Sequence, residues 1–265
     1  MVVATIKRGQ SRFYIDPDNG EIKVPGVTSV LSMLPKDFLK FWAAKLTAET
    51  AVSHWEHVQG IARTDPEGAI DYLKRAPDRF TRQAASVGSQ AHDIFERLAR
   101  GERVGRVSPD MVRYATHFAT FLQEMQPEFL FLEETVWSDD HGYAGSFDAI
   151  ARIDGETVIL DWKTTRSGVH EDVALQLKAY AMANRIILAV DGSSVPVPAI
   201  DAAAVLHVRP EGAKLVPVSC SDDLFDVFLS LLPIFQWERD RKKTVLGKPV
   251  WQTGTAETGT ERRAA

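Results

Sequence analysis

Two aspartates and a lysine stand at positions from which they could together hold a metal ion and act on water. Asp148 and Asp161 each lie in an apolar run with the composition of a β-strand, and Lys163 follows Asp161 by two residues. Between the runs stands Asp154-Gly155, a dipeptide typical of a two-residue hairpin turn. The sequence therefore predicts one hairpin that carries all three side chains.

The turn fixes the register of the two strands, which we predict at residues 143–153 and 156–163. Counting back from the turn places Asp148 directly opposite Asp161, and Lys163 shares the face of Asp161 because side chains alternate along a strand. Opposed Cβ atoms are about 5 Å apart, and like charges at that distance are destabilising. A bound cation would offset the repulsion, and carboxylates suit Mg²⁺ or Mn²⁺.

Two further pairs of side chains are spaced to share a helix face. His92 and Glu96 are four residues apart in an expected helix, where they could hold a metal or orient a water bound to it, or form a local surface pair. Gln176 and Tyr180 have the same spacing in a later helix. There, Tyr180 could pack and Gln176 point outward, or both could face the lysine and a nucleotide.

Composition limits the class of protein. The chain has 265 residues, an ordinary apolar content and a net charge of −5. No long uncharged apolar run or signal-peptide core is present, so we expect no membrane association and a cytoplasmic location, in a bacterium or a phage-infected host. Cys220 is the only cysteine, which excludes an iron–sulfur cluster and a cysteine zinc site within one chain. The negative charge argues against general coating of DNA but not against an enzyme that touches a few phosphates.

Patterns of hydrophobicity and turn residues predict an α/β fold: a mixed central sheet flanked by helices, with a helical N-terminal part. We expect a single domain over residues 1–246, divided into the helical part, about 26–126, and a core, about 127–246, followed by a disordered tail over 247–265. Trp42 and Phe41 are assigned to the core in preference to a role as wedges that stack on bases. The expected helices are 28–35 with Thr28 or Ser29 as cap, 37–59, 66–75, 78–100, 108–125, 171–190 and 221–241 with Ser221 as cap. The remaining elements are a small hairpin at 4–24, strands at 128–138, 202–209 and 213–219, and a loop at 191–201.

Taken together, these motifs resemble the RecB-like exonuclease branch of the PD-(D/E)XK nuclease superfamily, which has a restriction-endonuclease-like core. The branch includes phage-encoded members and the mitochondrial genome-maintenance exonuclease. The resemblance spans about residues 13–181 and departs from relatives that hold an iron–sulfur cluster on four cysteines. The matching segments are the Gly88–His92–Glu96 helix, Gly145-Ser146-Phe147-Asp148, Leu160-Asp161-Trp162-Lys163-Thr164-Thr165, Gln176-Leu177-Lys178-Ala179-Tyr180, and the N-terminal Val27-Thr28-Ser29-Val30-Leu31-Ser32 and Trp42-Ala43-Ala44.

The resemblance implies a metal-dependent deoxyribonuclease that uses Mg²⁺ or Mn²⁺ to hydrolyse phosphodiester bonds from DNA ends, in recombination, repair or phage DNA metabolism. Lys163 would position and activate the attacking water. Gln176 and Tyr180 would orient Lys163 and the DNA backbone. The metal ligands would be Asp148, Asp161, the Trp162 backbone carbonyl and His92. Glu133 or Glu134 would hold a second metal or a metal-bound water, and of these two we select Glu134.

The partners implied are single- or double-stranded DNA ends and a recombination or helicase protein. Glu96 and Arg166 are further DNA-binding candidates. The basic residues Lys74, Arg75, Arg79 and Arg82 form either a phosphate-binding patch or a solvated helix face. Two other interpretations stay open: a catalytically silent nuclease fold that serves as a DNA-binding or scaffold module, and a sequence-specific endonuclease.

Overall fold

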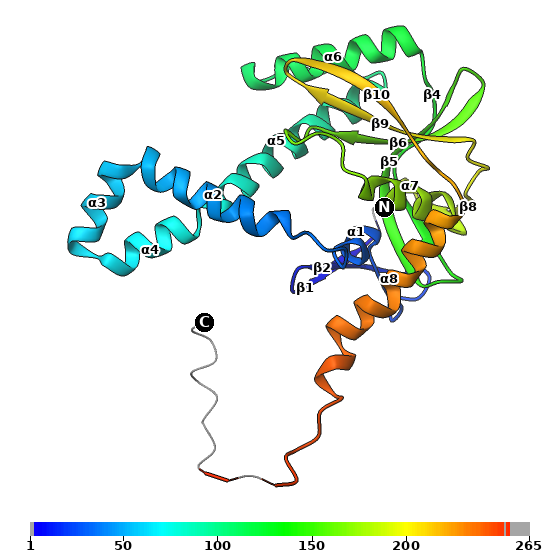
Figure 1. Cartoon of the computed structure of the whole chain (residues 1–265). Helices are drawn as coiled ribbons and strands as arrows, with labels where there is room; N and C mark the ends of the chain where they lie inside the picture. The colour runs from blue at the N-terminus through cyan, green and yellow to red at the C-terminus, as the bar shows by residue number, and fades with distance from the viewer. Residues whose placement is uncertain (1–2, 252, 255–265) are drawn as a thin grey trace.

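The computed structural model describes residues 3–251 and 253–254, which form an α/β fold (Figure 1). Within these residues, the central sheet has seven strands in the order β10-β9-β6-β5-β4-β7-β8, and a separate sheet has the order β1-β2-β3. Strands β6 and β9 run parallel, whereas the other neighbours in the central sheet are antiparallel. The expected α/β class with a mixed central sheet is confirmed. The expected tail falls in part on residues 252 and 255–265, outside the described residues.

The bounds of the elements follow chain order. The strands are β1 (Thr5–Arg8), β2 (Ser11–Ile15), β3 (Lys23–Pro25), β4 (Glu128–Ser138), β5 (Tyr143–Ile153), β6 (Glu156–Lys163), β7 (Arg185–Ile187), β8 (Ser194–Pro196), β9 (Ala202–Arg209) and β10 (Gly212–Val218). The helices are α1 (Val27–Leu31), α2 (Phe38–Ser53), α3 (Trp55–Thr64), α4 (Pro66–Lys74), α5 (Ala76–Ala99), α6 (Pro109–Met125), α7 (Asp172–Ala181), α8 (Asp223–Arg239) and the 3-10 helix η1 (Arg241–Lys243).

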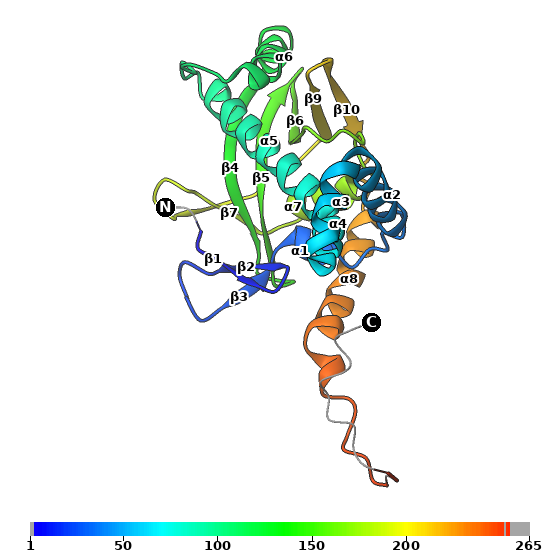
Figure 2. The same ribbon diagram turned by 90° about the vertical axis from the view of Figure 1, so that its left-hand side faces the viewer.

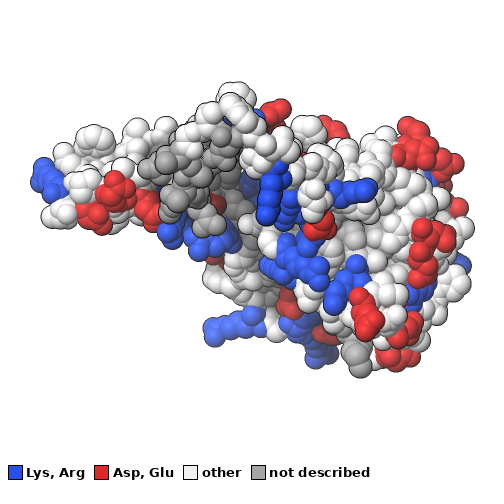
Figure 3. Space-filling model, turned by 90° about the horizontal axis from the view of Figure 1, so that it is seen from below, with Lys and Arg blue, Asp and Glu red and all other residues white. Residues whose placement is uncertain are grey.

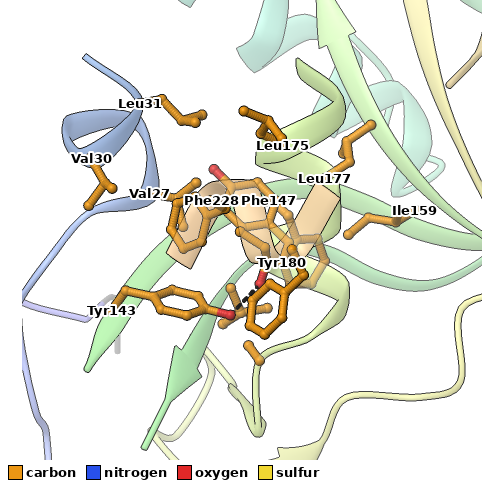
Figure 4. Close-up of a cluster of buried hydrophobic side chains, with 14 of the residues drawn as sticks. Val27, Val30, Leu31, Tyr143, Phe147, Ile159, Leu175, Leu177, Tyr180 and Phe228 are labelled. Carbon is orange, nitrogen blue, oxygen red and sulfur yellow. Dashed lines mark hydrogen bonds between the residues drawn. The ribbon is translucent and has the colours of Figure 1, made fainter. Parts of the chain in front are cut away.

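Two hydrophobic clusters cover the two faces of the central sheet. One joins β5 and β6 to α1, α7 and α8, as the converging side chains of Figure 4 show. The other lies under α5 and α6, which run along the sheet in Figure 2, and contains Trp162, Phe95 and Phe118. Alternate residues of β6 enter different clusters: Ile159 joins the first, and Leu160 and Trp162 the second. Each fully buried side chain of this size contributes roughly 2–3 kcal/mol, so β6 is held firmly from both sides.

Most of the predicted elements are confirmed within two residues of their expected bounds. These are α4, α5, α6, β4, the β5–β6 hairpin, β9 and β10. Gly101, with φ of 72°, follows the end of α5 as expected of a helix-terminating glycine.

The N-terminal segment is a three-stranded meander rather than the predicted single hairpin. The turn-rich stretch 16–20 does make a turn, which joins β2 to β3 and in which Asp16 accepts a hydrogen bond from the Asp18 N–H at 2.9 Å. A second turn at Gly9, with φ of 64°, joins β1 to β2. The sequence analysis missed it because a lone glycine is a weaker turn signal than a cluster.

The helix predicted over 171–190 ends at Ala181, and the chain continues as strand β7, in which Ile186 pairs with Val136 of β4. The expected loop at 191–201 contains β8, which extends the same edge. A short buried apolar run such as Ile186-Ile187 fits a helix or a strand equally well by periodicity, and pairing with the edge of β4 decides in favour of the strand.

The predicted capping residues are wrong for two helices. Gly26, not Thr28 or Ser29, precedes α1, and the Ser29 hydroxyl instead accepts a hydrogen bond from the Arg12 N–H at 2.9 Å. Asp222, not Ser221, precedes α8.

Helices α2, α3 and α4 form an arm that extends away from the sheet (Figure 1). The single helix predicted over 37–59 is broken at His54, which separates α2 from α3. No residue of α2 or α3 is buried, and Phe41 is 77% exposed, so its assignment to the core is wrong. Trp42 contacts Phe80 of α5, with ring centroids 5.8 Å apart.

Charge is unevenly distributed over the surface. On the face shown in Figure 3, Lys and Arg side chains gather near the middle and Asp and Glu side chains near the right-hand edge. The net charge of −5 therefore averages over basic and acidic regions. No helix among the described residues is long and apolar enough to cross a membrane.

Candidate functional site

The β5–β6 hairpin has the register that the sequence predicts. Its pairs run from Ile153 opposite Glu156 to Ala149 opposite Leu160, and the turn is made by Asp154 and Gly155, whose φ angles are 50° and 86°. Positive φ at both positions is the geometry of the type I′ turn that this dipeptide favours. The regular pairing stops one position before Asp148 and Asp161, so the two aspartates lie where the strands begin to separate.

Asp148 bridges β6 and α5. Its Oδ2 accepts a hydrogen bond from the Trp162 N–H at 2.5 Å, and its Oδ1 lies 3.4 Å from Nδ1 of His92. Burial alone would lower the pKa of His92, but the hydrogen bond and the charge of Asp148 outweigh it and raise that pKa. The simple picture of two carboxylates facing each other across a ladder is therefore corrected: Asp148 contacts the α5 side of the site, whereas Asp161 contacts α7.

Glu133 completes a compact group of donor atoms with His92 and Asp148. One nitrogen or oxygen from each of the three lies within 4.8 Å of the others. The backbone of Glu133 has φ of 53°, a left-handed conformation that is unusual for glutamate and interrupts the pairing of β4 with β5. Burial, and then the charge of Asp148, raise the pKa of Glu133 to about 8. Its Oε1 is buried and has no hydrogen-bond partner among the described residues.

Glu134, which the sequence analysis selected as a ligand, lies elsewhere. Its Oε2 accepts a hydrogen bond from the Ala189 N–H at 2.6 Å, so it fixes the chain after β7. The register of β4 on β5 explains the correction: Leu132 pairs with Ala149 and Glu134 with Phe147, so Glu133 lies opposite Asp148. This register depends on a shift between Phe129 and Phe131, for which simple strand alternation gives no signal.

Asp161 lies at the centre of a second group of contacts. Its Oδ1 accepts hydrogen bonds from Lys163 Nζ at 2.9 Å and from Gln176 Nε2 at 2.8 Å. Its Oδ2 lies 2.7 Å from Lys163 Nζ in an ion pair whose geometry is not that of a hydrogen bond, and it has no other partner among the described residues. Burial, and then the charge of Asp148, raise the pKa of Asp161. Gln176 therefore faces the site instead of pointing to solvent.

Tyr180 is buried against the hairpin, with its hydroxyl group beside Gln176. Its side chain is 2% exposed and packs against Gly145 of β5, where an added Cβ would lie 2.4 Å from the ring carbon Cε1. Tyr180 thus lies in the layer behind Gln176, and its expected role in orienting Lys163 and the DNA backbone stays a prediction. The ring sets the spacing between α7 and the hairpin, so Tyr180 positions Gln176 indirectly.

Most of the other residues that we expected to contact DNA instead form hydrogen bonds or ion pairs with neighbouring residues of the same chain. Glu96 forms an ion pair with Arg100 at 2.9 Å, on the same helix. Arg75 pairs with Asp71 at 2.8 Å, and Arg79 donates to the Tyr72 carbonyl at 2.8 Å. Lys74, Arg75, Arg79 and Arg82 therefore fit a solvated helix face better than a shared phosphate site.

The chemistry of these donors fits a hard divalent cation. Carboxylate oxygens suit Mg²⁺ and Mn²⁺, an imidazole nitrogen suits transition metals, and the unpartnered Oε1 of Glu133 is the kind of buried atom that a cation would satisfy. Asp161 lies outside the group of His92, Glu133 and Asp148. It lies close enough to the group for the charge of Asp148 to raise its pKa, after the larger effect of burial. An ammonium group, Lys163, stands beside the cluster.

Comparison with known proteins adds little to this geometry. No family model matches the sequence, and no curated protein matches it. Eighteen chains of solved structures match, among them the crystal structure of SSO0001, with a TM-score of 0.32 and 13% identity over 77% of this chain and 87% of that one. A likeness at this level carries no argument, so the site is interpreted from its own residues.

Proposed function

We propose that this chain is a metal-dependent DNA exonuclease of the PD-(D/E)XK superfamily, which hydrolyses phosphodiester bonds in recombination, repair or phage DNA metabolism. The observation that carries the proposal is the placement of Lys163 Nζ, 2.7 Å from Asp161 and next to the group of His92, Glu133 and Asp148. An ammonium group beside a cation site of this kind suits a reaction in which negative charge develops on a phosphate.

The residues divide into a cation-binding group and a group that acts on water and phosphate. His92, Glu133 and Asp148 would hold Mg²⁺ or Mn²⁺, with Asp161 at the side toward Lys163. The bound cation would neutralise phosphate oxygens and lower the pKa of water. The Trp162 N–H holds Asp148 in place, and the backbone carbonyl of Trp162 would be a further ligand.

Lys163 is held in its charged form. Burial alone would lower its pKa, but the charge of Asp161 and its hydrogen bond outweigh burial and raise it. At neutral pH the side chain is therefore a positive charge rather than a base. In this role Lys163 would orient water through its N–H donors and stabilise charge on the phosphate. Gln176 would keep the shared carboxylate of Asp161 in place.

Cleavage of labelled DNA tests the proposal. Purified protein with Mg²⁺ or Mn²⁺ is expected to degrade end-labelled linear DNA, and Lys163→Ala and Asp161→Asn are expected to abolish this without loss of folding. Lys7→Ala, which removes an exposed lysine of β1, is the matched control. Activity in Lys163→Ala equal to that of the wild type would overturn the mechanism.

The same assay separates the other interpretations. Binding without cleavage by the wild-type protein, with either cation, would favour a scaffold or DNA-binding module. Cleavage of closed circular DNA at the rate of linear DNA would indicate an endonuclease. Substrates labelled at the 5′ or the 3′ end report the polarity of digestion.

A further inference from the structure

A cleft of about 840 Å³ opens against the candidate site on the side of α5 and α6. Its walls are the first half of α5, the start of α6, the chain that follows β6 and the end of β9. His92, Trp162 and Lys163 line its inner end, so whatever occupies the cleft reaches the cation-binding group and the lysine.

Three arginines from three separate elements converge on this cleft. Arg113 belongs to α6, Arg166 follows β6, and Arg209 ends β9. With Lys163 they make four basic side chains along the cleft, against one acidic side chain, Asp110. A chain with a net charge of −5 thus gathers positive charge beside its candidate site.

Strand β9 holds the chain after β6 in place. Lys163 pairs with His207 in the parallel register, and Nε2 of His207 lies 2.8 Å from the Thr165 carbonyl oxygen. Arg209 donates through one guanidinium nitrogen, Nη1, to the Thr164 carbonyl at 2.8 Å and to the Tyr114 hydroxyl at 3.2 Å. These bonds fix the segment that carries Arg166.

The geometry of Arg209 leaves donors for a ligand. Both of its hydrogen bonds use Nη1, and Nε lies 3.7 Å from a Glu211 oxygen, a separation that is too long for a hydrogen bond. The guanidinium is only 19% exposed, so its orientation is set by the protein. A fixed planar guanidinium matches the oxygens of a phosphate.

We propose that Arg113, Arg166 and Arg209 bind successive phosphates of a DNA strand and so lead the strand through this cleft to Lys163. The proposal rests on the proposed function for the identity of the strand. The phosphate-binding track formed by these three arginines gives a role to β9, which no sequence motif indicated. The track lies in the cleft and not along the basic residues of α4 and the start of α5.

Salt dependence of binding tests this track independently of cleavage. The full-length protein is titrated with a fluorescent oligonucleotide, single- or double-stranded, in EDTA, and the logarithm of the binding constant is plotted against that of the salt concentration. Arg113→Gln and Arg166→Gln remove exposed side chains, and each is expected to reduce the slope by about 0.7 for a single strand or 0.9 for a duplex. Arg152→Gln, an exposed arginine on β5 outside the cleft lining, is the matched control with an unchanged slope.

Arg209→Gln is expected to reduce the slope in the same way and also to loosen the segment after β6, whereas Arg209→Lys keeps the charge and restores the slope. Slopes equal to that of the wild type in both Arg113→Gln and Arg166→Gln would overturn the track. So would a wild-type protein that binds neither oligonucleotide at low salt. Binding with the expected slopes but without cleavage would contradict the nuclease proposal and support the phosphate-binding role of the arginines. Cleavage with unchanged slopes would support the nuclease proposal and contradict that role.

Discussion

Gln176 on α7 donates a hydrogen bond to Asp161 on β6 at 2.8 Å, and through the same carboxylate oxygen it is linked to Lys163. The contact joins a helix to the hairpin in the interior of the protein, where Asp161 is only 4% exposed. A carboxylate shared in this way has one orientation, so the lysine that pairs with it is oriented as well.

Removal of the Gln176 amide should therefore impair the reaction more than the fold. In Gln176→Leu, a substitution of similar size, we expect kcat to fall about 10- to 100-fold, the range associated with loss of a partner that orients a site residue. Michaelis–Menten analysis of DNA cleavage measures this, with circular dichroism to verify folding. Gln90→Leu, on the exposed side of α5, is the control. A change confined to KM would contradict a role in orienting Asp161 and Lys163.

The raised pKa of Glu133 predicts a pH-dependent stability in the absence of cations. Its folded pKa of about 8 exceeds the ordinary value of 4.5, so the stability that its protonated form contributes is present below pH 4.5 and is lost as pH rises through 8. In EDTA, Glu133→Gln should be more stable than the wild type at pH 8 by roughly 2 kcal/mol, because each pKa unit corresponds to about 1.4 kcal/mol and the side chain is partly exposed.

Urea unfolding at a series of pH values measures this difference. The advantage of Glu133→Gln should shrink toward pH 5, and an advantage that stays constant with pH would contradict the assignment. The parallel substitution Glu128→Gln, at an exposed glutamate that begins β4, is the control and should not reproduce the pattern.

Addition of cation should stabilise the folded protein through His92, Glu133 and Asp148. At a Mn²⁺ concentration 100 times Kd, the expected gain in the free energy of unfolding is about 2.7 kcal/mol. His92→Ala and Asp148→Asn should each lose most of the Mn²⁺-dependent rise in Tm, as measured by thermal unfolding with and without the ion. His141→Ala, a histidine in the turn between β4 and β5 and outside the group, should keep it. An equal rise in all variants would show that Mn²⁺ binds elsewhere.

Two glycines should respond in opposite directions to the same substitution. A Cβ at Gly145 would meet the Tyr180 ring, so Gly145→Ala should destabilise the protein by about 1–3 kcal/mol. Gly60 lies inside α3 and a Cβ there meets nothing within 4 Å, so Gly60→Ala should stabilise by about 0.5–1 kcal/mol. Denaturant unfolding measures both. If both substitutions changed the free energy of unfolding by the same small amount, α7 would have to move away from the hairpin to make room for the new methyl group at position 145.

The parts of the molecule that depend on local pattern could be predicted from the sequence. The Asp154-Gly155 turn specified the hairpin register, and with it the neighbourhood of Asp148, Asp161 and Lys163. Long amphipathic helices such as α5 and α6 could also be predicted, because their apolar residues recur with the helical period.

The features that depend on distant packing could not. The register shift between Phe129 and Phe131 sets the pairing that places Glu133, rather than Glu134, opposite Asp148, and no local residue pattern predicts it. The burial of Tyr180 follows from the absence of a side chain at Gly145 on another element. The parallel pairing of β9 with β6 brings Arg166 and Arg209 together, and the contact of α6 with β9 adds Arg113, so the three converge from distant parts of the chain.

The left-handed conformation of Glu133 has a consequence for natural variation. A non-glycine residue at positive φ costs about 1 kcal/mol, which Gly would avoid and Asn would reduce. A descendant that kept the fold but abandoned the chemistry would gain stability by such an exchange, whereas one under selection for the site would not accept it. Under the proposed function, the residue at position 133 would therefore distinguish relatives that keep the cation-binding group from relatives that have lost it.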